Sequence, residues 1–99
     1  MRVGGDEITI HVSSEDSGGA LLVAEVGMAA GGGPPAPHRH DAAEVYRVDD
    51  GELAIYVEDD GGSLRRFVTG RGDVVHIPGG RAHTVRNESG AAARAYVVF

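Results

Sequence analysis

Residues 32–51 read G-G-P-P-A-P-H-R-H-D-A-A-E-V-Y-R-V-D-D-G, so a proline-rich segment runs directly into two histidines and a glutamate. Proline removes a backbone hydrogen-bond donor, and residues 31–37 therefore cannot form a central strand. The β-type run Val45–Val48 that follows is typical of a strand. The stretch predicts a loop followed by a strand, with His38, His40 and Glu44 at the junction.

A second stretch that contains glycine and proline, residues 72–87, reads G-D-V-V-H-I-P-G-G-R-A-H-T-V-R-N and contributes His83. Together, His38, His40, Glu44 and His83 offer neutral imidazole nitrogens and one carboxylate. That donor set suits iron, manganese, zinc, nickel or copper better than calcium or magnesium. Any one of the four alone would be an ordinary polar surface residue, whereas the set predicts a site for one divalent transition-metal ion.

The spacing of these residues is compatible with one shared face. Alternate side chains of a strand point to the same side, so His38 and His40 can point together. Glu44 is four residues after His40. This even spacing lets Glu44 point to the same side as His38 and His40 if residues 41–43 form a small irregularity. His83 comes from about 40 residues away and must be brought in by a precisely registered, closed fold.

The two stretches resemble the two motifs of the cupin superfamily. The first motif is Gly, five residues, His-x-His, three or four residues, Glu, six residues and Gly; it is filled by Gly32, His38, His40, Glu44 and Gly51. The second is Gly, five residues, Pro-x-Gly, two residues, His, three residues and Asn; it is filled by Gly72, Pro78, Gly80, His83 and Asn87. The motifs cover roughly a third of the chain.

The resemblance to small single-domain cupins implies an all-β fold, a small antiparallel β-barrel or double-sheet jelly roll. It also implies that His38, His40, Glu44 and His83 are the metal ligands, held inside the barrel. At 99 residues the chain has room for one domain, so we expect residues 1–99 to form a single cupin β-barrel domain.

The pattern outside the motifs agrees, because short β-type runs alternate with turn residues and no segment favours a helix. Eight or nine strands are expected, which indicates a sandwich or barrel. Turns are predicted at 13–19 and 49–52, and a hairpin at 59–62. The expected strands are Ile8–Val12, 20–28, Val45–Val48, Leu53–Val57, Leu64–Val68, Val74–Ile77, 83–85 and 94–99.

Composition excludes several classes of function. The formal net charge of −6 and the pI near 5.2 argue against nonspecific nucleic-acid binding. The sequence has no lysine and no cysteine, which excludes Schiff-base chemistry on a lysine, thiolate catalysis and disulfides. No apolar run reaches the length of a signal peptide or a membrane span, so we expect a cytoplasmic protein without a membrane partner.

Two further side chains are candidates for chemistry. Tyr46 is two residues past Glu44, so alternation places it on the ligand face, where its phenol can orient a substrate or simply form a pocket wall. We take Tyr46 as the candidate catalytic residue. His76 can transfer protons or support a ligand, but an outward position is slightly favoured.

The remaining conspicuous residues have simpler expected roles. Asn87 and Asp73 are expected to tie turns. His11, Arg39 and Arg81 are expected at the surface. The aromatic residues expected in the core or in an interface are Tyr56, Phe67, Tyr96 and Phe99.

The function expected from the resemblance is a metal-dependent enzyme acting on a small oxygenated organic molecule. Dioxygenase-like chemistry is favoured over isomerase, cyclase or lyase chemistry, because a His₃Glu shell suits redox-active iron or manganese. The alternative is a non-catalytic, metal-stabilised module that binds or senses a small ligand. Edge strands commonly pair between subunits, and the last strand, rich in valine and tyrosine, is expected to do so in a homodimer.

Overall fold

The computed structural model describes residues 2–3, 6–13, 15, 18–19, 21–34 and 36–98, and these residues form an all-β structure in two antiparallel sheets. For Arg2–Val3 only the backbone is described. The described residues contain no helix long and apolar enough to span a membrane. The strands are β1 Arg2–Val3, β2 Asp6–Val12, β3 Val23–Met28, β4 Glu44–Asp50, β5 Glu52–Glu58, β6 Leu64–Gly70, β7 Val74–Ile77, β8 His83–Arg86 and β9 Ala93–Val98.

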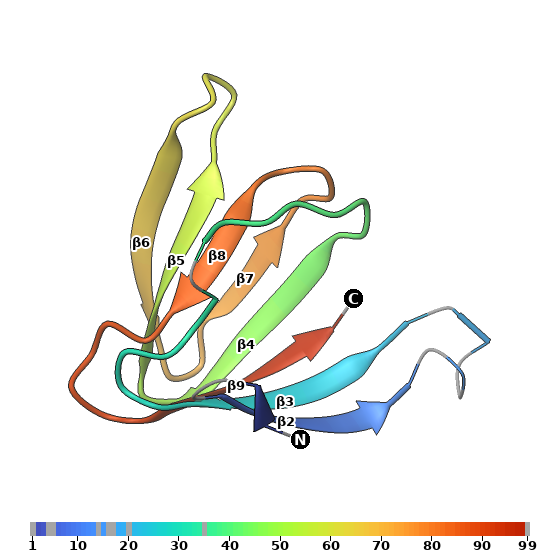
Figure 1. Ribbon diagram of the computed structural model, residues 1–99, viewed down its shortest axis with the longest axis vertical. Coiled ribbons are helices and arrows are strands. Elements are labelled where there is room, and N and C mark those ends of the chain that lie inside the picture. Colours follow the sequence, from blue (N-terminus) through green and yellow to red (C-terminus); the bar gives the residue numbers. More distant parts are fainter. Residues whose placement is uncertain are drawn as a thin grey trace.

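The larger sheet has the strand order β1-β2-β3-β9-β4-β7, and the smaller sheet has the order β6-β5-β8. Strands β4 and β5 belong to different sheets although only Gly51 separates them. In Figure 1 these two strands meet at that residue and diverge from it. The turn predicted at 49–52 is therefore a passage between sheets, and the hairpin predicted at 59–62 does connect paired strands, β5 and β6.

The hydrophobic core lies between the two sheets. Alternation along each strand turns its apolar side chains inward, where burial of apolar area stabilises the fold. The large sheet contributes Val48, Val75 and Ile77, and the small sheet contributes Leu53, Ile55 and Val85. Residues between these positions, such as Arg47 and His76, face outward and are exposed.

Three details differ from the sequence-based expectations. Strand β9 is not an edge strand, because it pairs with β3 on one side and with β4 on the other. The strand expected over 20–28 begins only at Val23, and Ala20 lies outside the described residues, as does Phe99. Phe67 is 40% exposed on β6, so it is not a core residue, and the interface position that was its other expected role stays a prediction.

Candidate metal centre

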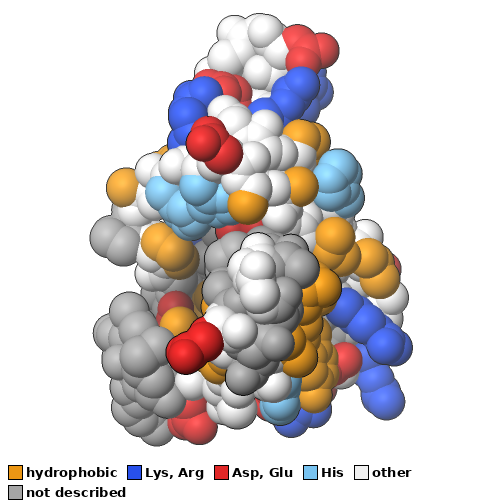
Figure 2. All heavy atoms as spheres, turned by 90° about the vertical axis from the view of Figure 1, so that its right-hand side faces the viewer, with side chains coloured by type: hydrophobic (Ala, Val, Ile, Leu, Met, Phe, Trp, Pro, Cys, Tyr) orange, Lys and Arg blue, Asp and Glu red, His pale blue; other side chains and the backbone are white. Residues whose placement is uncertain are grey.

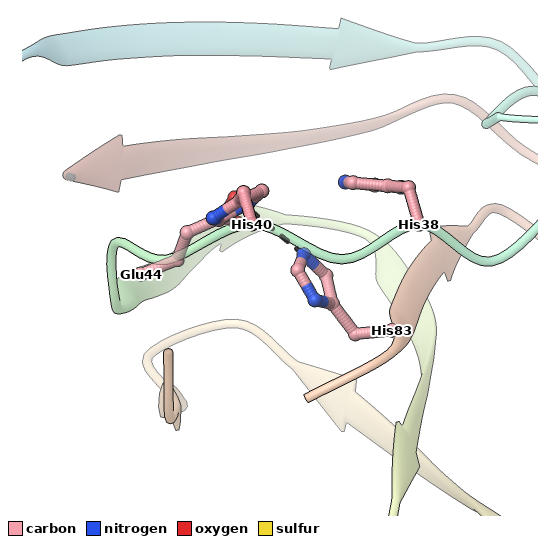
Figure 3. Close-up of side chains that lie close together, drawn as sticks. All are labelled: His38, His40, Glu44 and His83. Carbon is pink, nitrogen blue, oxygen red and sulfur yellow. Dashed lines mark hydrogen bonds and ion pairs between the residues drawn. The ribbon is translucent and has the colours of Figure 1, made fainter. Parts of the chain in front are cut away.

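Four side chains from two distant parts of the chain converge at one point. The ligand atoms of His38, His40, Glu44 and His83 all lie within 4.8 Å of one another. His38 and His40 come from the loop before β4, Glu44 begins β4, and His83 begins β8 of the other sheet. Figure 3 shows these side chains pointing toward one another. The fold thus brings together all four residues that the sequence singles out.

A short backbone bridge fixes the relative position of His38 and His83. The His38 N–H donates to the His83 carbonyl at 2.9 Å, and the His83 N–H donates to the His38 carbonyl at 2.8 Å. The bridge is antiparallel and isolated, because His38 belongs to no named strand whereas His83 begins β8. It places the two imidazole rings side by side, with ring centroids 4.4 Å apart.

The segment between His40 and Glu44 is the irregularity that the spacing predicts. Residues 41 and 42 form a bend, and β4 starts at Glu44. The Gly80 N–H donates to the His40 carbonyl at 2.7 Å. Gly79 packs so closely that an added Cβ would lie 2.1 Å from the Asp41 carbonyl oxygen. The turn after β7 therefore supports the bend that separates the two ligands.

Backbone carbonyls set the tautomers of two of the histidines. His40 Nδ1 lies 2.8 Å from the Ala42 carbonyl oxygen, and His83 Nδ1 lies 3.0 Å from the Arg81 carbonyl oxygen. A carbonyl can only accept, so in each ring Nδ1 carries the hydrogen. In the neutral imidazole, Nε2 then presents a lone pair to the centre of the cluster, which is the usual arrangement of a metal-binding histidine.

The donor set fits a bound cation. Glu44 and His83 are 3% and 1% exposed, and Glu44 Oε2 and His83 Nε2 are buried atoms without a hydrogen-bond partner among the described residues. Glu44 Oε1 faces Nε2 of His40 and lies 3.5 Å from Nε2 of His83. Lone pairs that converge in a buried place are costly unless a positive charge lies between them. A divalent transition metal supplies that charge.

Local electrostatics keep His38 in the form that a metal requires. Burial and the neighbouring His83 ring lower the pKa of His38, and His40 adds to this effect. The Glu44 carboxylate acts in the opposite direction but does not reverse it. A lowered pKa favours the neutral imidazole, whose unprotonated nitrogen can bind a metal ion.

An apolar cavity of about 360 Å³ opens onto two of the four side chains. Its polar lining consists of Asp6, His38, Glu44 and Tyr46. Its apolar lining comes from Ile8, Ile10, Leu22, Ala24, Val26, Met28, Pro34, Val85 and Val97. On the face shown in Figure 2, histidine side chains reach the surface beside hydrophobic ones, while charged side chains lie at the upper end and in the lower part of the view. Such a cavity, with few polar groups, is typical of a small-molecule site.

Tyr46 lies where strand alternation predicts it, on the Glu44 side of β4 and in the cavity wall. Burial raises the pKa of the Tyr46 phenol strongly, and the adjacent Glu44 carboxylate raises it further. The phenol therefore keeps its proton at neutral pH and is a hydrogen-bond donor rather than a base.

The other histidines are remote from the cavity. His76 is exposed on β7 opposite Val45, so the outward position favoured for it is confirmed. His11 is exposed, stacks on Tyr96 with ring centroids 5.5 Å apart, and lies 3.6 Å from Glu25.

The two arginines beside the ligands also point away from the cluster. Arg39 donates to the Gly80 carbonyl and to Glu58. Arg81, which is half-buried, donates to the Glu58 carbonyl and to Asp60. Both side chains tie the ligand-bearing segments to the end of the β5–β6 hairpin.

Asn87 and Asp73 tie turns, as the sequence predicts. Asn87 is 0% exposed, and its Nδ2 donates to the Met28 and Ala91 carbonyls at 2.9 and 2.7 Å. Its Oδ1 accepts from the N–H and the hydroxyl of Ser89. Asp73 Oδ2 accepts from the Gly70 N–H at 2.8 Å.

Asp6 belongs to neither sequence motif, yet it is the one acidic residue besides Glu44 in the described cavity wall. Its Oδ1 is a buried atom with no hydrogen-bond partner among the described residues. Burial raises the pKa of Asp6, although the Gly33 N–H and the charge of Arg86 act against this. The available signal was alternation, since Asp6 shares a face of β2 with Ile8 and Ile10, and both of these line the same cavity.

Comparison with known proteins decides the family. The sequence model of the Cupin domain matches residues 24–99. The chain is a cupin. No curated protein matches the chain by sequence, so the further comparisons are with solved structures.

Solved structures similar to this cupin include several enzymes. An oxalate oxidase is 28% identical with a TM-score of 0.80; the match covers 96% of this chain and 50% of that protein. A polyketide cyclase, RemF from Streptomyces resistomycificus, is 24% identical with a TM-score of 0.78, covering 96% and 64%. An oxalate decarboxylase from Bacillus subtilis with Mn(II) centres is 20% identical with a TM-score of 0.84, covering 100% and 26%.

These comparisons support the cupin fold across the whole sheet arrangement. This cupin spans about half the length of the oxalate oxidase chain and about a quarter of that of the decarboxylase. The last two likenesses, each under 25% identical, show the fold alone. Because unrelated chemistries share one fold, the reaction must be argued from the site of this chain.

Proposed function

We propose that this cupin binds one divalent transition-metal ion through His38, His40, Glu44 and His83 and acts as an enzyme on a small oxygenated organic molecule. The observation that carries the proposal is the convergence of four ligand atoms within 4.8 Å at the wall of an apolar cavity. The buried lone pairs of Glu44 and His83, which lack described partners, support it.

The residues of the chain have separate roles in this proposal. The bridge between His38 and His83 and the bend after His40 hold the ligands in place before any metal arrives. The apolar wall excludes water from the bound molecule and strengthens the few polar contacts inside it. Tyr46 keeps its proton, is hydrogen-bonded to the Glu44 side chain, and orients the substrate from the cavity wall. The metal, when bound, supplies Lewis-acid or redox chemistry beside these groups.

Oxidative chemistry of the dioxygenase kind is favoured within this class. The His₃Glu donor set would hold redox-active iron or manganese, which would supply oxidative chemistry there. The likeness to an oxalate oxidase is in keeping with this preference. Isomerase or cyclase chemistry is the second choice within the enzyme class.

A non-catalytic module that binds or senses a small ligand is the alternative. It is favoured by the shortage of proton-transfer groups in the described cavity wall, where Tyr46 cannot serve as a base at neutral pH. Asp6 is the group that would distinguish an enzyme from such a module, since a carboxylate can move a proton.

Metal content of the purified protein, measured by mass spectrometry, tests the proposal. The variants are His38→Ala and His83→Ala, with His76→Ala as the matched control because that histidine is exposed and outside the cluster. We expect about one equivalent of metal in wild type and in His76→Ala, and loss of it in the other two. Wild-type protein that stays free of metal after incubation with divalent ions would overturn the proposal.

Oxygen consumption with a panel of small enols, diketones and hydroxy acids then separates the two functions. Consumption by the metal-loaded wild type that is absent in His83→Ala supports the oxidative enzyme. A ligand that binds the metal-loaded protein and is recovered unchanged, with and without oxygen, supports the binding module.

A further inference from the structure

The cavity of this cupin has an acidic polar group that the metal centre does not use. Asp6 comes from β2 in the large sheet, whereas the ligands come from the loop before β4, from β4 and from β8. Asp6, His38 and Glu44 nevertheless line the same cavity of about 360 Å³. A molecule that fills this cavity therefore touches both the metal ligands and the Asp6 carboxyl group.

The two oxygens of the Asp6 carboxyl group have different surroundings, and Oδ1 is enclosed against Gly32, so a molecule in the cavity can reach only the other oxygen. The Gly33 N–H provides a hydrogen bond to the carboxyl group, and Arg86 lies near enough to act on it by charge. Arg86 itself donates to the carbonyls of Pro34 and Gly31. Oδ1 remains buried without a hydrogen-bond partner among the described residues, and burying such an atom costs free energy.

Gly32 explains how this carboxyl group comes to be so well enclosed. A Cβ built on Gly32 would lie 2.8 Å from Asp6 Oδ1 and 2.9 Å from the Ala29 carbonyl oxygen. The first glycine of the motif thus packs directly against the Asp6 carboxyl group. The orientation of Asp6 is therefore fixed by the loop that also leads to His38.

We infer that Asp6 binds a hydroxyl group of the substrate through its oxygen other than Oδ1, so that the substrate is a molecule with an apolar body and an uncharged hydroxyl group. This inference rests on the proposed function, because it names the substrate class of the same cavity. A hydroxyl donates its hydrogen to an ionised carboxylate and can also pair with a protonated carboxyl group. The contact therefore forms in either protonation state.

The lining of the cavity disfavours a small dicarboxylate such as oxalate. Apart from the ligand His38, the described lining contains no basic side chain, and its remaining charged groups are the acids Asp6 and Glu44. One anionic group can approach the metal, but a second would meet apolar wall and the Asp6 carboxylate. Burying a charge without a partner is far more costly than burying a hydroxyl that has one.

Equilibrium binding to the metal-loaded protein tests the inference with a pair of matched probes. The probes are 2-naphthol and its methyl ether 2-methoxynaphthalene, which share a ring system and differ in the hydroxyl hydrogen, and oxalate is the third ligand. We expect 2-naphthol to bind about tenfold more tightly than the ether, and oxalate to bind more weakly than 2-naphthol.

Variants of Asp6 locate the contact. Asp6→Leu should abolish the preference for 2-naphthol over the ether, whereas Asp6→Asn, which keeps an accepting oxygen, should retain part of it. Glu7→Gln is the matched control, because Glu7 is exposed on the opposite face of β2. Circular dichroism and metal content of each variant should match those of wild type, since Asp6 is not a ligand.

The outcomes separate this inference from the proposed function. If the wild-type protein binds no metal, the proposed function itself is wrong. Three results with metal-loaded protein would overturn the inference and leave the proposed metal centre untouched. They are tighter binding of oxalate than of 2-naphthol, binding of none of the three ligands, and an unchanged preference for 2-naphthol in Asp6→Leu. Loss of the preference in both Asp6→Leu and Glu7→Gln would also overturn it.

Discussion

The main chains of His38 and His83 hold each other through two reciprocal hydrogen bonds of 2.9 and 2.8 Å. The relative position of these two candidate ligands, which are 45 positions apart in the sequence, is thus fixed by backbone hydrogen bonds and not by contacts of their rings. The rings themselves differ in environment, since the His83 side chain is 1% exposed and His38 is an exposed residue. This difference allows the metal-binding role of each ring to be separated from its structural role.

We expect His38→Ala and His83→Ala to lose metal equally but to differ in the stability of the metal-free protein. Removal of the exposed His38 ring should change the free energy of unfolding by less than about 0.5 kcal/mol. Removal of the buried His83 ring leaves a cavity and an unpaired Arg81 carbonyl, so it should cost about 2 kcal/mol. Urea denaturation in the presence of a chelator measures both values; equal losses would contradict the assigned environments.

Tyr46→Phe should weaken substrate binding without changing metal content, and it should alter the alkaline stability of the protein. The ordinary pKa of tyrosine is 10.0, and burial with the Glu44 carboxylate raises the pKa of Tyr46 in the folded state. Above the ordinary value the unfolded chain releases this proton while the folded chain retains it, so the free energy of unfolding falls as the pH rises. In Tyr46→Phe the free energy of unfolding should fall less steeply with pH above the ordinary tyrosine pKa of 10.0, as measured by denaturation at several pH values. An unchanged slope would show that the phenol is not buried.

Asn87→Ala should be among the most destabilising single substitutions outside the apolar core. It leaves the Met28 carbonyl without its donor in a buried place and removes one of the two donors to the Ala91 carbonyl, the other being the Ser89 hydroxyl. We expect a loss of about 3 kcal/mol, against about 1 kcal/mol for Ser89→Ala, which removes one partner of the same turn. Thermal denaturation of the two variants provides the comparison, and similar losses would contradict this account of the turn.

Gly79→Ala should disturb the metal centre from outside it. The added methyl group would lie against the Asp41 carbonyl, in the bend between His40 and Glu44. We expect metal affinity to fall about tenfold or more, as it does when supporting contacts of ligands are removed. Gly90→Ala is the control, because a Cβ there meets nothing within 4 Å and its φ is not in the left-handed region. Equal affinities in a competition titration would exclude this coupling.

A homodimer remains our proposal for the assembly of this cupin, with a different surface from the one first expected. The last strand, β9, lies inside the sheet, whereas the edge strands β6 and β7 carry exposed apolar side chains, among them Leu64 at 45% and Val74 at 64%. Exposed edges of this kind favour pairing between subunits. Analytical ultracentrifugation should show a dimer across micromolar concentrations, and a monomer throughout that range would refute the proposal.

Much of the candidate centre could be predicted because its residues are fixed by local rules. Alternation placed Tyr46 beside Glu44 and turned Arg47 and His76 outward, and the even step from His40 to Glu44 called for the bend at 41–43. The position of His83 depended on the likeness to the cupin motifs, since no local pattern specifies which distant strand reaches the ligands.

The parts that could not be predicted depend on which strands become neighbours. The composition of β9 suits an edge strand, but pairing with both β3 and β4 is a property of the whole sheet. The inward position of Asp6 cannot be predicted locally for the same reason, because an Asp-Glu pair at the start of a strand is usually solvated. Only the placement of β2 over the cavity turns one of these two carboxyl groups inward.

The position of β9 also governs the order in which this protein can fold. β2 and β3 form a wall of the cavity, yet they join the ligand-bearing β4 only through β9, which is hydrogen-bonded between them. The wall and the ligand-bearing strand are therefore joined in one sheet only when residues 93–98 are in place. Closure of such distant segments is slow compared with formation of a hairpin. The pocket is thus completed by the late, long-range pairing of β9, and substrate capture depends on that step.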